Sequence, residues 1–290
     1  MAAYAAKQHV KNTVYLGVGT VGRLRRPVTG GLRVLLYHKV NDAEGNPGSV
    51  PTALFAEHMA LIDAEGYRPV ALDNVLDHLY RGASLPPRAT LITFDDGYRD
   101  NLVGAAPILA RSGYPAVLFV SVGSIGSDVP FPHDEGLPTR NPTLDWEGLA
   151  EIERLGVRVE SHGITHVPLA RLASSTAERE LVTSKRVLEE HLGRPIRAYA
   201  YVKGGVADFQ QQHRAMLRRS GYEAAFTTVT GLNKSGADPF ALRRYNVEPY
   251  PASTLSLVLR GACDAMALKD SGPGTAARRA FNRVLRTTSK

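Results

Sequence analysis

The sequence predicts an α/β fold, specifically a distorted and incomplete (β/α) barrel of about seven parallel strands in a single domain. Short apolar, β-branched runs alternate with longer helical stretches, which is typical of parallel strands joined by crossover helices. No GxGxxG motif follows a strand, so a barrel is favoured over a dinucleotide-binding sheet. Five helical stretches are each followed by a glycine, where a left-handed residue ends a helix: Gly66, Gly113, Gly156, Gly193 and Gly221.

The elements follow one another with little interruption. Apolar runs rich in β-branched residues predict strands at Arg33–His38, Ala89–Asp95, Ala116–Ser121, Val157–Ser161, Arg197–Val202, Glu223–Thr228 and Ala241–Val247. The stretches between them predict helices at Thr52–Glu65, Asp73–Tyr80, Asn101–Arg111, Asp145–Arg154, Ser175–His191 and Phe209–Arg218. The segment 123–143 breaks the rhythm with four prolines. A loop of that length in a compact domain is usually functional or disordered, and its residues are candidates to line a groove.

Composition excludes several classes of protein. Hydrophobic residues make up 43% and charged residues 22% of the 290 residues, close to the average globular protein, so disorder, collagen and coiled coil are excluded. No run approaches the roughly 20 apolar residues that span a bilayer. A single cysteine, Cys263, can form neither an internal disulfide nor a cysteine-rich zinc site, and it is compatible with a reducing compartment.

The net charge of +7 is concentrated at the two ends. Residues 1–33 contain six basic and no acidic residues, and residues 269–290 contain six basic residues and one acid, which leaves −4 for the rest. An acidic core argues against nucleic-acid binding. We expect a basic N-terminal segment (1–32), a central folded domain (33–250) and a helical, basic C-terminal tail (251–290). The ends are either solvated or make peripheral contact with a membrane. Without a convincing signal peptide, a cytoplasmic location, with contact at the inner membrane face, is favoured.

Reactive side chains gather where the predicted strands end, which is where barrel enzymes place their catalytic groups. Asp95 and Asp96 end one strand, and their side chains would point to opposite sides, one toward a metal and the other toward substrate. The alternative is an ordinary Asp–Asp–Gly turn. His162 and His166 end another strand, and two imidazoles with one carboxylate make a three-ligand metal site. Taken alone, this histidine pair could equally be structural.

Four motifs together resemble one family. They are LLYHKV (35–40), TFDDGY (93–98), SHGITH (161–166) and an AYxxGG run (200–205). The chain resembles the NodB-homology polysaccharide deacetylases, carbohydrate esterase family 4, over roughly residues 33–250. The order of the motifs is similar to that of the circularly permuted PgaB/IcaB-like branch. The resemblance implies an incomplete barrel, a divalent metal and hydrolysis of an N-acetyl group on an amino sugar of a poly- or oligosaccharide or glycoconjugate.

The resemblance also implies roles for single residues. Asp96, His162 and His166 would bind the metal, most readily Zn²⁺, with Co²⁺, Ni²⁺ and Mn²⁺ as alternatives. Asp95 would be the general base, and His38 the general acid that protonates the leaving amine. Arg244 would pair with Asp95, although Arg243 beside it is an equal candidate.

Three further positions bear on the substrate groove. The backbone N–H of Lys203 would hold the oxyanion. Val202 stands where the family usually has proline, which removes rigidity but leaves that backbone donor in place. Trp146 either lines the groove or is a core residue.

Other functions remain open at this point. A facial-triad iron oxygenase also uses two histidines and one carboxylate, but such enzymes are usually antiparallel β-sandwiches. A non-catalytic carbohydrate-binding relative would keep the groove and lose one of the reactive groups. A deformylase or deacetylase of a lipid-linked sugar would share the fold, and the basic ends favour it.

Overall fold

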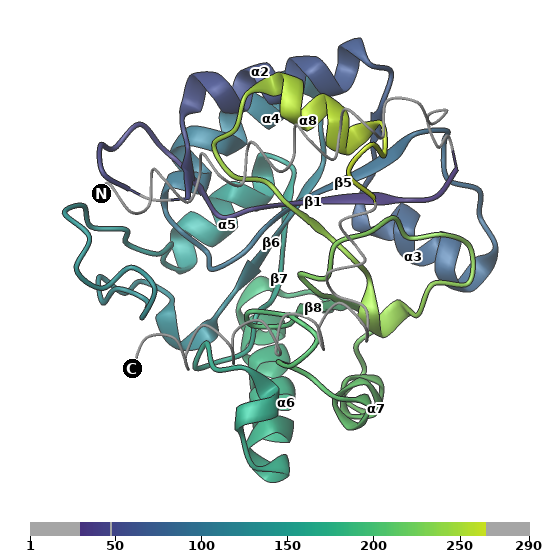
Figure 1. The fold of residues 1–290 in the computed structure, drawn as a ribbon. Helices are drawn as coiled ribbons and strands as arrows, with labels where there is room; N and C mark the ends of the chain where they lie inside the picture. Colours follow the sequence, from purple (N-terminus) through teal and green to yellow (C-terminus); the bar gives the residue numbers. More distant parts are fainter. Residues whose placement is uncertain (1–29, 47, 265–290) are drawn as a thin grey trace, which may run out of the picture.

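A curled, parallel sheet is the centre of the molecule. The computed structural model describes residues 30–46 and 48–264, and Figure 1 shows the sheet with helices around it. The strands on its continuous path are, in spatial order, β10 (Tyr245–Asn246), β1 (Arg33–Tyr37), β5 (Ala89–Phe94), β6 (Ala116–Val120), β7 (Val157–Ser161), β8 (Ala198–Ala200) and β9 (Ala224–Phe226). The short strand β4 (Arg68–Pro69) pairs with β5 beside this path. The predicted incomplete barrel of about seven parallel strands is therefore confirmed.

The two ends of the sheet come close to each other without forming a full ladder. The residues predicted as a last strand, Ala241–Val247, form only the two-residue β10, because a 3₁₀ turn at Pro239–Ala241 precedes it. Leu242 makes an isolated parallel bridge with Phe226 of β9, and three residues later Tyr245 pairs with Leu35 of β1. This one segment therefore spans the gap between the first and last strands.

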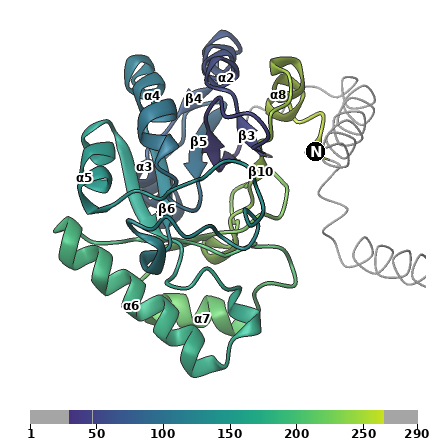
Figure 2. The same cartoon turned by 90° about the vertical axis from the view of Figure 1, so that its left-hand side faces the viewer.

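Helices form an outer layer on the sheet, as Figure 2 shows. They are α2 (Thr52–Ala64), α3 (Leu72–Arg81), α4 (Ala106–Ser112), α5 (Trp146–Arg154), α6 (Ser174–Leu192), α7 (Gln211–Arg219) and α8 (Ala252–Leu259), and a π-helical turn at Asn101–Ala105 leads into α4. All five glycines predicted to end helices have positive φ, between 66° and 89°. A short parallel pair outside the barrel, β2 (Lys39–Val40) and β3 (Ser49–Val50), was not predicted.

The core has one part on each face of the sheet. The larger cluster contains the apolar sides of α2, α4, α5, α6 and α8, and the smaller cluster contains α3 together with alternate residues of β5, β6, β8 and β9. Because both faces are covered, the strands are buried along their whole length, as parallel strands require.

Residues on both sides of 33–250 also contact the barrel. Leu32 is buried and exchanges two backbone hydrogen bonds with Asn233. At the other end, α8 buries Leu255 and Val258, and Asp264 forms an ion pair of 2.8 Å with Arg33 of β1. Most of the predicted basic segments, residues 1–29 and 265–290, lies outside the described residues.

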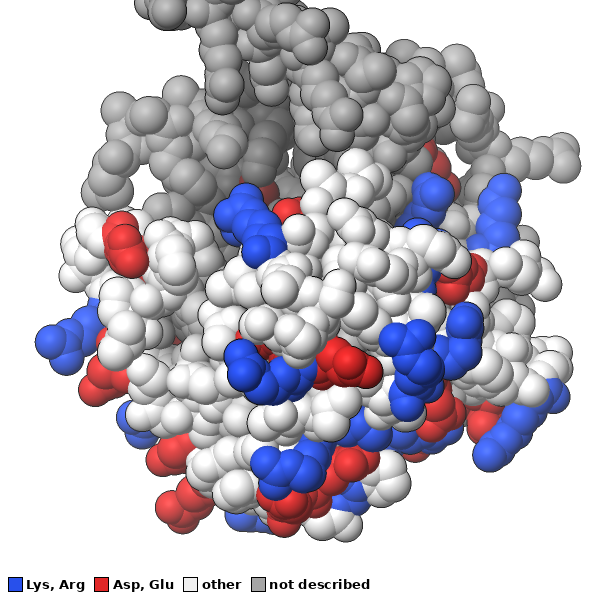
Figure 3. Space-filling model, turned by 90° about the horizontal axis from the view of Figure 1, so that it is seen from below, with Lys and Arg blue, Asp and Glu red and all other residues white. Residues whose placement is uncertain are grey.

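The described surface gives two observations on possible partners. Within the described ranges, no helix has the length and apolar character needed to cross a membrane. Figure 3 shows the face that carries α6 and α7, where acidic and basic side chains are interleaved. On α6, for example, Lys185 pairs with Glu189 and Arg186 with Glu190.

Candidate active site

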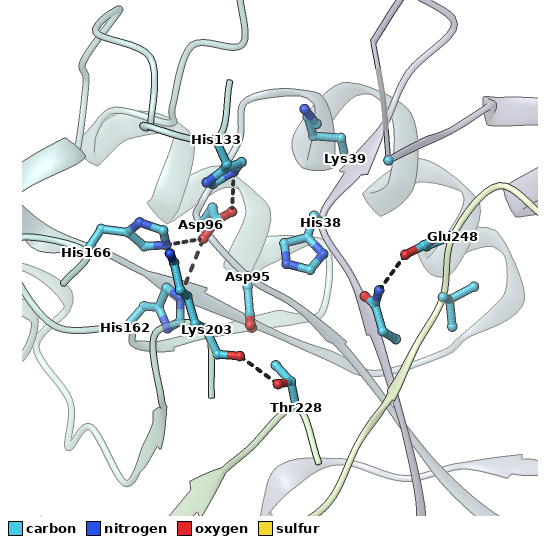
Figure 4. A pocket seen from close by; sticks show the side chains of 13 residues that line it. His38, Lys39, Asp95, Asp96, His133, His162, His166, Lys203, Thr228 and Glu248 are labelled. Atoms are coloured by element: carbon cyan, nitrogen blue, oxygen red, sulfur yellow. Dashed lines mark hydrogen bonds and ion pairs between the residues drawn. The ribbon is translucent and has the colours of Figure 1, made fainter. Parts of the chain in front are cut away.

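The carboxyl ends of the strands meet around one pocket of about 310 Å³, shown in Figure 4. Residues just past β1, β5, β7, β8 and β9 line it, and so do residues of the last strand and the segment after it. The predicted site residues that line it are His38, Asp95, Asp96, His162, His166 and Lys203. The topology thus brings together side chains that are up to 165 positions apart in the sequence, from His38 to Lys203.

Asp96 lies at the centre of a cluster of imidazoles. Its Oδ1 atom is 3.0 Å from His166 Nε2 and 3.4 Å from His162 Nε2. His162 Nδ1 lies 2.8 Å from the carbonyl oxygen of Ala200, and it can only donate to that oxygen. In its neutral form the ring therefore carries its proton on Nδ1, which leaves the Nε2 lone pair on the side of Asp96, as is usual for metal-binding histidines.

The backbone at this cluster is held in unusual conformations. Asp96 has a φ of 76° and His166 a φ of 55°, a region that non-glycine residues rarely occupy. Such conformations persist only where the surroundings enforce them, and they concentrate at functional sites.

Glu180 of α6 provides much of this enforcement for the turn between the two histidines. Its buried carboxylate accepts hydrogen bonds from the backbone N–H of Ile164 and Thr165, at 2.6 and 3.0 Å, and from the Thr165 hydroxyl at 2.7 Å. Gly163 is required here, since a Cβ would lie 3.0 Å from Glu180 Oε2 and the residue has a φ of 85°. Sequence analysis missed Glu180, although an acidic residue among the buried positions of α6 was a usable signal.

Asp95 points away from the imidazoles and pairs with a buried arginine. Both carboxylate oxygens of Asp95 accept from the Arg244 guanidinium at 2.7 Å, and Arg244 Nε donates to the carbonyl oxygen of Thr227 at 2.8 Å. Arg244 rather than Arg243 makes this pair. Burial alone would raise the pKa of Asp95, but the charges of Arg244 and His162 outweigh it and lower the pKa. Asp95 is therefore an ionised carboxylate with a fixed orientation.

His38 follows β1 and lies in the same pocket (Figure 4). Burial lowers its pKa, and the negative charges of Asp96 and Asp95 oppose that effect only in part. In the substrate-free protein the imidazole is thus mainly neutral at neutral pH, and added negative charge nearby would favour its protonation.

Lys203 forms a tight turn after β8. Its φ is 59°, and its carbonyl oxygen accepts from the Thr228 hydroxyl at 2.6 Å. Gly204 continues the turn. A side chain is excluded at this position, because a Cβ would lie 2.8 Å from the Thr228 backbone nitrogen. Val202 is buried, so the position that usually holds proline is fixed by packing.

Trp146 does not lie in the pocket. Its indole, at the start of α5, stacks on the imidazole of His191 on α6, with ring centroids 3.8 Å apart and planes at 9°. It is partly buried against the larger core cluster. The structure places it among packing residues between two helices, which is the second of the two interpretations that the sequence left open.

The 123–143 loop contributes a residue that sequence analysis did not identify. His133 lines the pocket, and its Nε2 is 3.5 Å from Asp96 Oδ2. The loop itself is tied to the segment after β1 by a buried ion pair of 2.7 Å between Lys39 and Asp134. A histidine in a long loop with no helix or strand of its own was the available signal.

The cluster fits a divalent metal ion. One ligand atom each from Asp96, His162 and His166 can be chosen such that all lie within 4.8 Å of one another. One carboxylate and two imidazoles suit Zn²⁺ and similar ions and leave coordination positions open. Asp96 Oδ2 is buried without a hydrogen-bond partner in the described structure, as expected of a carboxylate whose proper partner is a cation. Burial would raise the pKa of Asp96, but the neighbouring imidazoles of His133, His162 and His166 hold it well below its usual range.

Comparisons with known proteins agree with this geometry. The polysaccharide deacetylase family profile matches residues 82–225. The polysaccharide deacetylase homologue YxkH of Bacillus subtilis is 27% identical over 218 residues, which are 75% of this chain and 72% of YxkH. The poly-β-1,6-N-acetyl-D-glucosamine N-deacetylase of Escherichia coli K12 is 30% identical over 132 residues, 43% of this chain but 19% of that enzyme. The structure of IcaB from Ammonifex degensii superposes with a TM-score of 0.67 at 25% identity, covering 80% of this chain and 97% of IcaB. The chain therefore belongs to the polysaccharide deacetylases with a NodB-like domain, a family of hydrolases whose members similar to this chain include IcaB.

Proposed function

We propose that the protein is a metal-dependent N-deacetylase that removes the acetyl group from an amino sugar of a poly- or oligosaccharide. The observation that carries the proposal is the convergence on one pocket of a metal-binding triad, an ionised carboxylate and a buried histidine: Asp96, His162, His166, Asp95 and His38. The name of the Escherichia coli relative supports an N-acetylated glucosamine polymer as the substrate class.

Each remaining task of amide hydrolysis has a residue of suitable chemistry. When bound by the triad, a divalent ion would supply Lewis-acid chemistry: it lowers the pKa of water and polarises the acyl carbonyl. Asp95, held by Arg244, would accept the proton of the attacking water. The Lys203 N–H would donate to the oxyanion, since this residue lines the pocket in a strained turn. His38 would protonate the leaving nitrogen, and the negative charge that develops beside it favours its protonated form.

Chelation and substitution test the metal part of this proposal. We expect dialysis against a chelator to abolish acetate release from N-acetylglucosamine oligomers, and Zn²⁺ or Co²⁺ to restore it. The His162→Ala protein should lose bound metal. Metal content equal to that of the wild-type protein would contradict the ligand assignment.

Two alternatives are distinguished by the product. A deformylase or deacetylase of a lipid-linked sugar has the same chemistry, so release of formate from a formylated sugar, or acetate release confined to lipid-linked substrates, would favour it. A non-catalytic carbohydrate-binding relative would bind oligomers without product release. The intact set of reactive groups supports the enzyme.

The charge pattern supports a role for the ends in location. We infer that the basic residues within 1–29 and 265–290 bring the protein to an anionic membrane surface, where each adds about 1 kcal/mol. The favoured location is cytoplasmic, at the inner face of the membrane. Arg33 does not contribute, since it is buried and paired with Asp264. The full chain should pellet with anionic vesicles at low salt, and a protein trimmed to residues 30–264 should not. Equal pelleting would contradict the inference.

A further inference from the structure

A chain of polar contacts runs from the buried Lys39, which lines the pocket, to the carboxylate of Asp96. Lys39 Nζ lies 2.7 Å from Asp134 Oδ1, and Asp134 Oδ2 lies 2.8 Å from the Tyr98 hydroxyl. The same hydroxyl is 2.8 Å from His133 Nε2, which is in turn 3.5 Å from Asp96 Oδ2. Figure 4 shows the last contact, with His133 and His166 approaching different oxygens of Asp96.

The chemistry of these groups fixes the direction of the hydrogen bonds. Asp134 is ion-paired with Lys39, so its carboxylate is ionised and only accepts. Tyr98 has a single hydroxyl proton and must donate it to Asp134. The Tyr98 oxygen can then only accept from His133, which means that His133 Nε2 carries a hydrogen. The nitrogen that carries this hydrogen is 2.8 Å from the Tyr98 oxygen and 3.5 Å from Asp96 Oδ2, so the N–H can be shared between the two oxygens.

We propose that His133 is a positioning residue for the metal centre: its Nε2–H holds Oδ2 of Asp96, so that Oδ1 is directed at the metal. The inference rests on the metal centre of the proposed function. Oδ1 is the atom that faces His162 and His166, whereas Oδ2 is buried, makes no hydrogen bond within the described residues, and has His133 Nε2 at 3.5 Å as an ion-pair contact. Carboxylates that bind metals are typically oriented by such a second hydrogen bond, which raises metal affinity.

The loop is built to hold His133 in this orientation. Asp134, next to it, is fixed by the buried Lys39 and also accepts from Asn141 at 3.3 Å. Phe131 stacks on the His133 ring, with centroids 5.6 Å apart and planes at 5°, and it also contacts the ring of His166 at 4.6 Å. The side chain of His133 is 45% exposed, while its Nε2 atom contacts the buried Tyr98 and Asp96. A histidine without a role in the site would not need this number of contacts to fix its orientation.

Metal affinity measured without substrate tests the proposal. Metal-free protein is titrated with Zn²⁺ and Co²⁺ in competition with a chromophoric chelator. We expect His133→Ala to weaken binding by about 10- to 100-fold and to change the visible spectrum of bound Co²⁺. His133→Gln places an amide N–H near the position of Nε2 and should recover most of the affinity. His78, a half-buried histidine of α3 whose Nδ1 contacts the Ala83 carbonyl outside the pocket lining, provides the control: His78→Ala should match the wild type.

Several outcomes would overturn the positioning role. Wild-type affinity and an unchanged Co²⁺ spectrum in His133→Ala would show that Asp96 is oriented without it. Complete loss of binding, as expected for His162→Ala, would make His133 a ligand itself. Should His133→Ala fail to fold, Tyr98→Phe carries the test, because it preserves the ring but removes the link between His133 and Asp134; unchanged affinity would then refute the chain of contacts. A wild-type protein that binds neither ion would instead refute the metal centre, which is a separate failure.

Discussion

Asp96 and Glu160 are both buried carboxylates of the same sheet, but their neighbours differ in kind. Glu160 of β7 accepts from the backbone N–H of Arg197 and Ala198, both at 2.7 Å, and from Arg158 Nε at 2.8 Å. Asp96, after β5, is surrounded by the imidazoles of His133, His162 and His166. Backbone amides and guanidinium groups keep their protons at any physiological pH, whereas imidazoles release theirs easily.

This difference separates a structural carboxylate from one whose neighbours would allow metal binding. No cation can displace the donors around Glu160, so its hydrogen bonds are permanent. Burial raises the pKa of Glu160 in spite of them. Around Asp96 a divalent ion can replace the protons of the histidines, since metal binding is coupled to their release. Where on a strand a buried acid lies thus matters less than whether its donors can deprotonate.

Removing the charge of Asp96 should have the largest effect on metal binding and on acetate release. Asp96→Asn should weaken Zn²⁺ binding by more than about 100-fold, beyond what changes in outer partners cost, and reduce acetate release to background. Glu160→Gln is the matched control and should bind metal as the wild type does. Metal analysis after dialysis checks both, and an Asp96→Asn protein with full metal content would refute the assignment.

Asp95→Asn should separate the base from the metal centre. It removes a proton acceptor without changing shape, so turnover should fall by about 10²- to 10⁴-fold while metal content stays constant. The buried Arg244 loses its partner, so the assay must be run below the melting temperature of the variant. Activity within tenfold of wild type would mean that another group is the base.

His38→Ala should show a loss that depends on the substrate. An amide needs its leaving nitrogen protonated, and loss of that proton donor costs about 10²-fold or more. An aryl acetate ester has a leaving group that departs without a proton, so its hydrolysis should be affected much less. Equal losses for amide and ester would contradict the role of general acid, and Asp95→Asn serves as the reference that impairs both.

The sequence predicted those parts of the site that lie directly at strand ends. His38, Asp95, Asp96 and the His162–His166 pair follow strands whose alternation with helices was readable, so the topology alone brings them together. His133 and Glu180 escaped prediction because each reaches the site across the fold, one from a long loop and one from the middle of α6. Such contacts between distant segments leave no signal in the local pattern of apolar and polar residues. Helix α8 lies in the segment predicted as a helical tail, but its packing on the distant α2 could not be predicted, for the same reason.

On the structural side of the comparison, Glu160→Gln should affect stability alone. The amide still accepts from the backbone, but its NH₂ group meets the arginine donors, so a charge-assisted hydrogen bond is lost. Such bonds contribute about 1.5–3 kcal/mol. Chemical denaturation at pH 7 should show a decrease in the free energy of unfolding of this size, with turnover below the transition unchanged. If Glu160→Gln lost metal or turnover, Glu160 would not be a purely structural carboxylate, and its contrast with Asp96 would be wrong.

The smallest expected effect concerns a histidine with permanent partners. His58 of α2 is fully buried, with Nδ1 3.2 Å from the Tyr37 hydroxyl and Nε2 3.1 Å from the Tyr250 carbonyl. Burial lowers its pKa to about 4, below the ordinary value of 6.5. Between these values the unfolded chain binds the proton more readily, so stability is full above pH 6.5 and falls as the pH decreases. From pH 7.5 to 5.5 this residue should account for about 1 kcal/mol of lost stability. Urea unfolding of His58→Gln at both pH values should show a decrease smaller by that amount, with His78→Gln, at a half-buried position, as the control. Equal decreases in all three proteins would mean that His58 accepts a proton in the folded state. The hydrogen-bond partners of this buried imidazole would then not fix its protonation state, in contrast to those of Glu160.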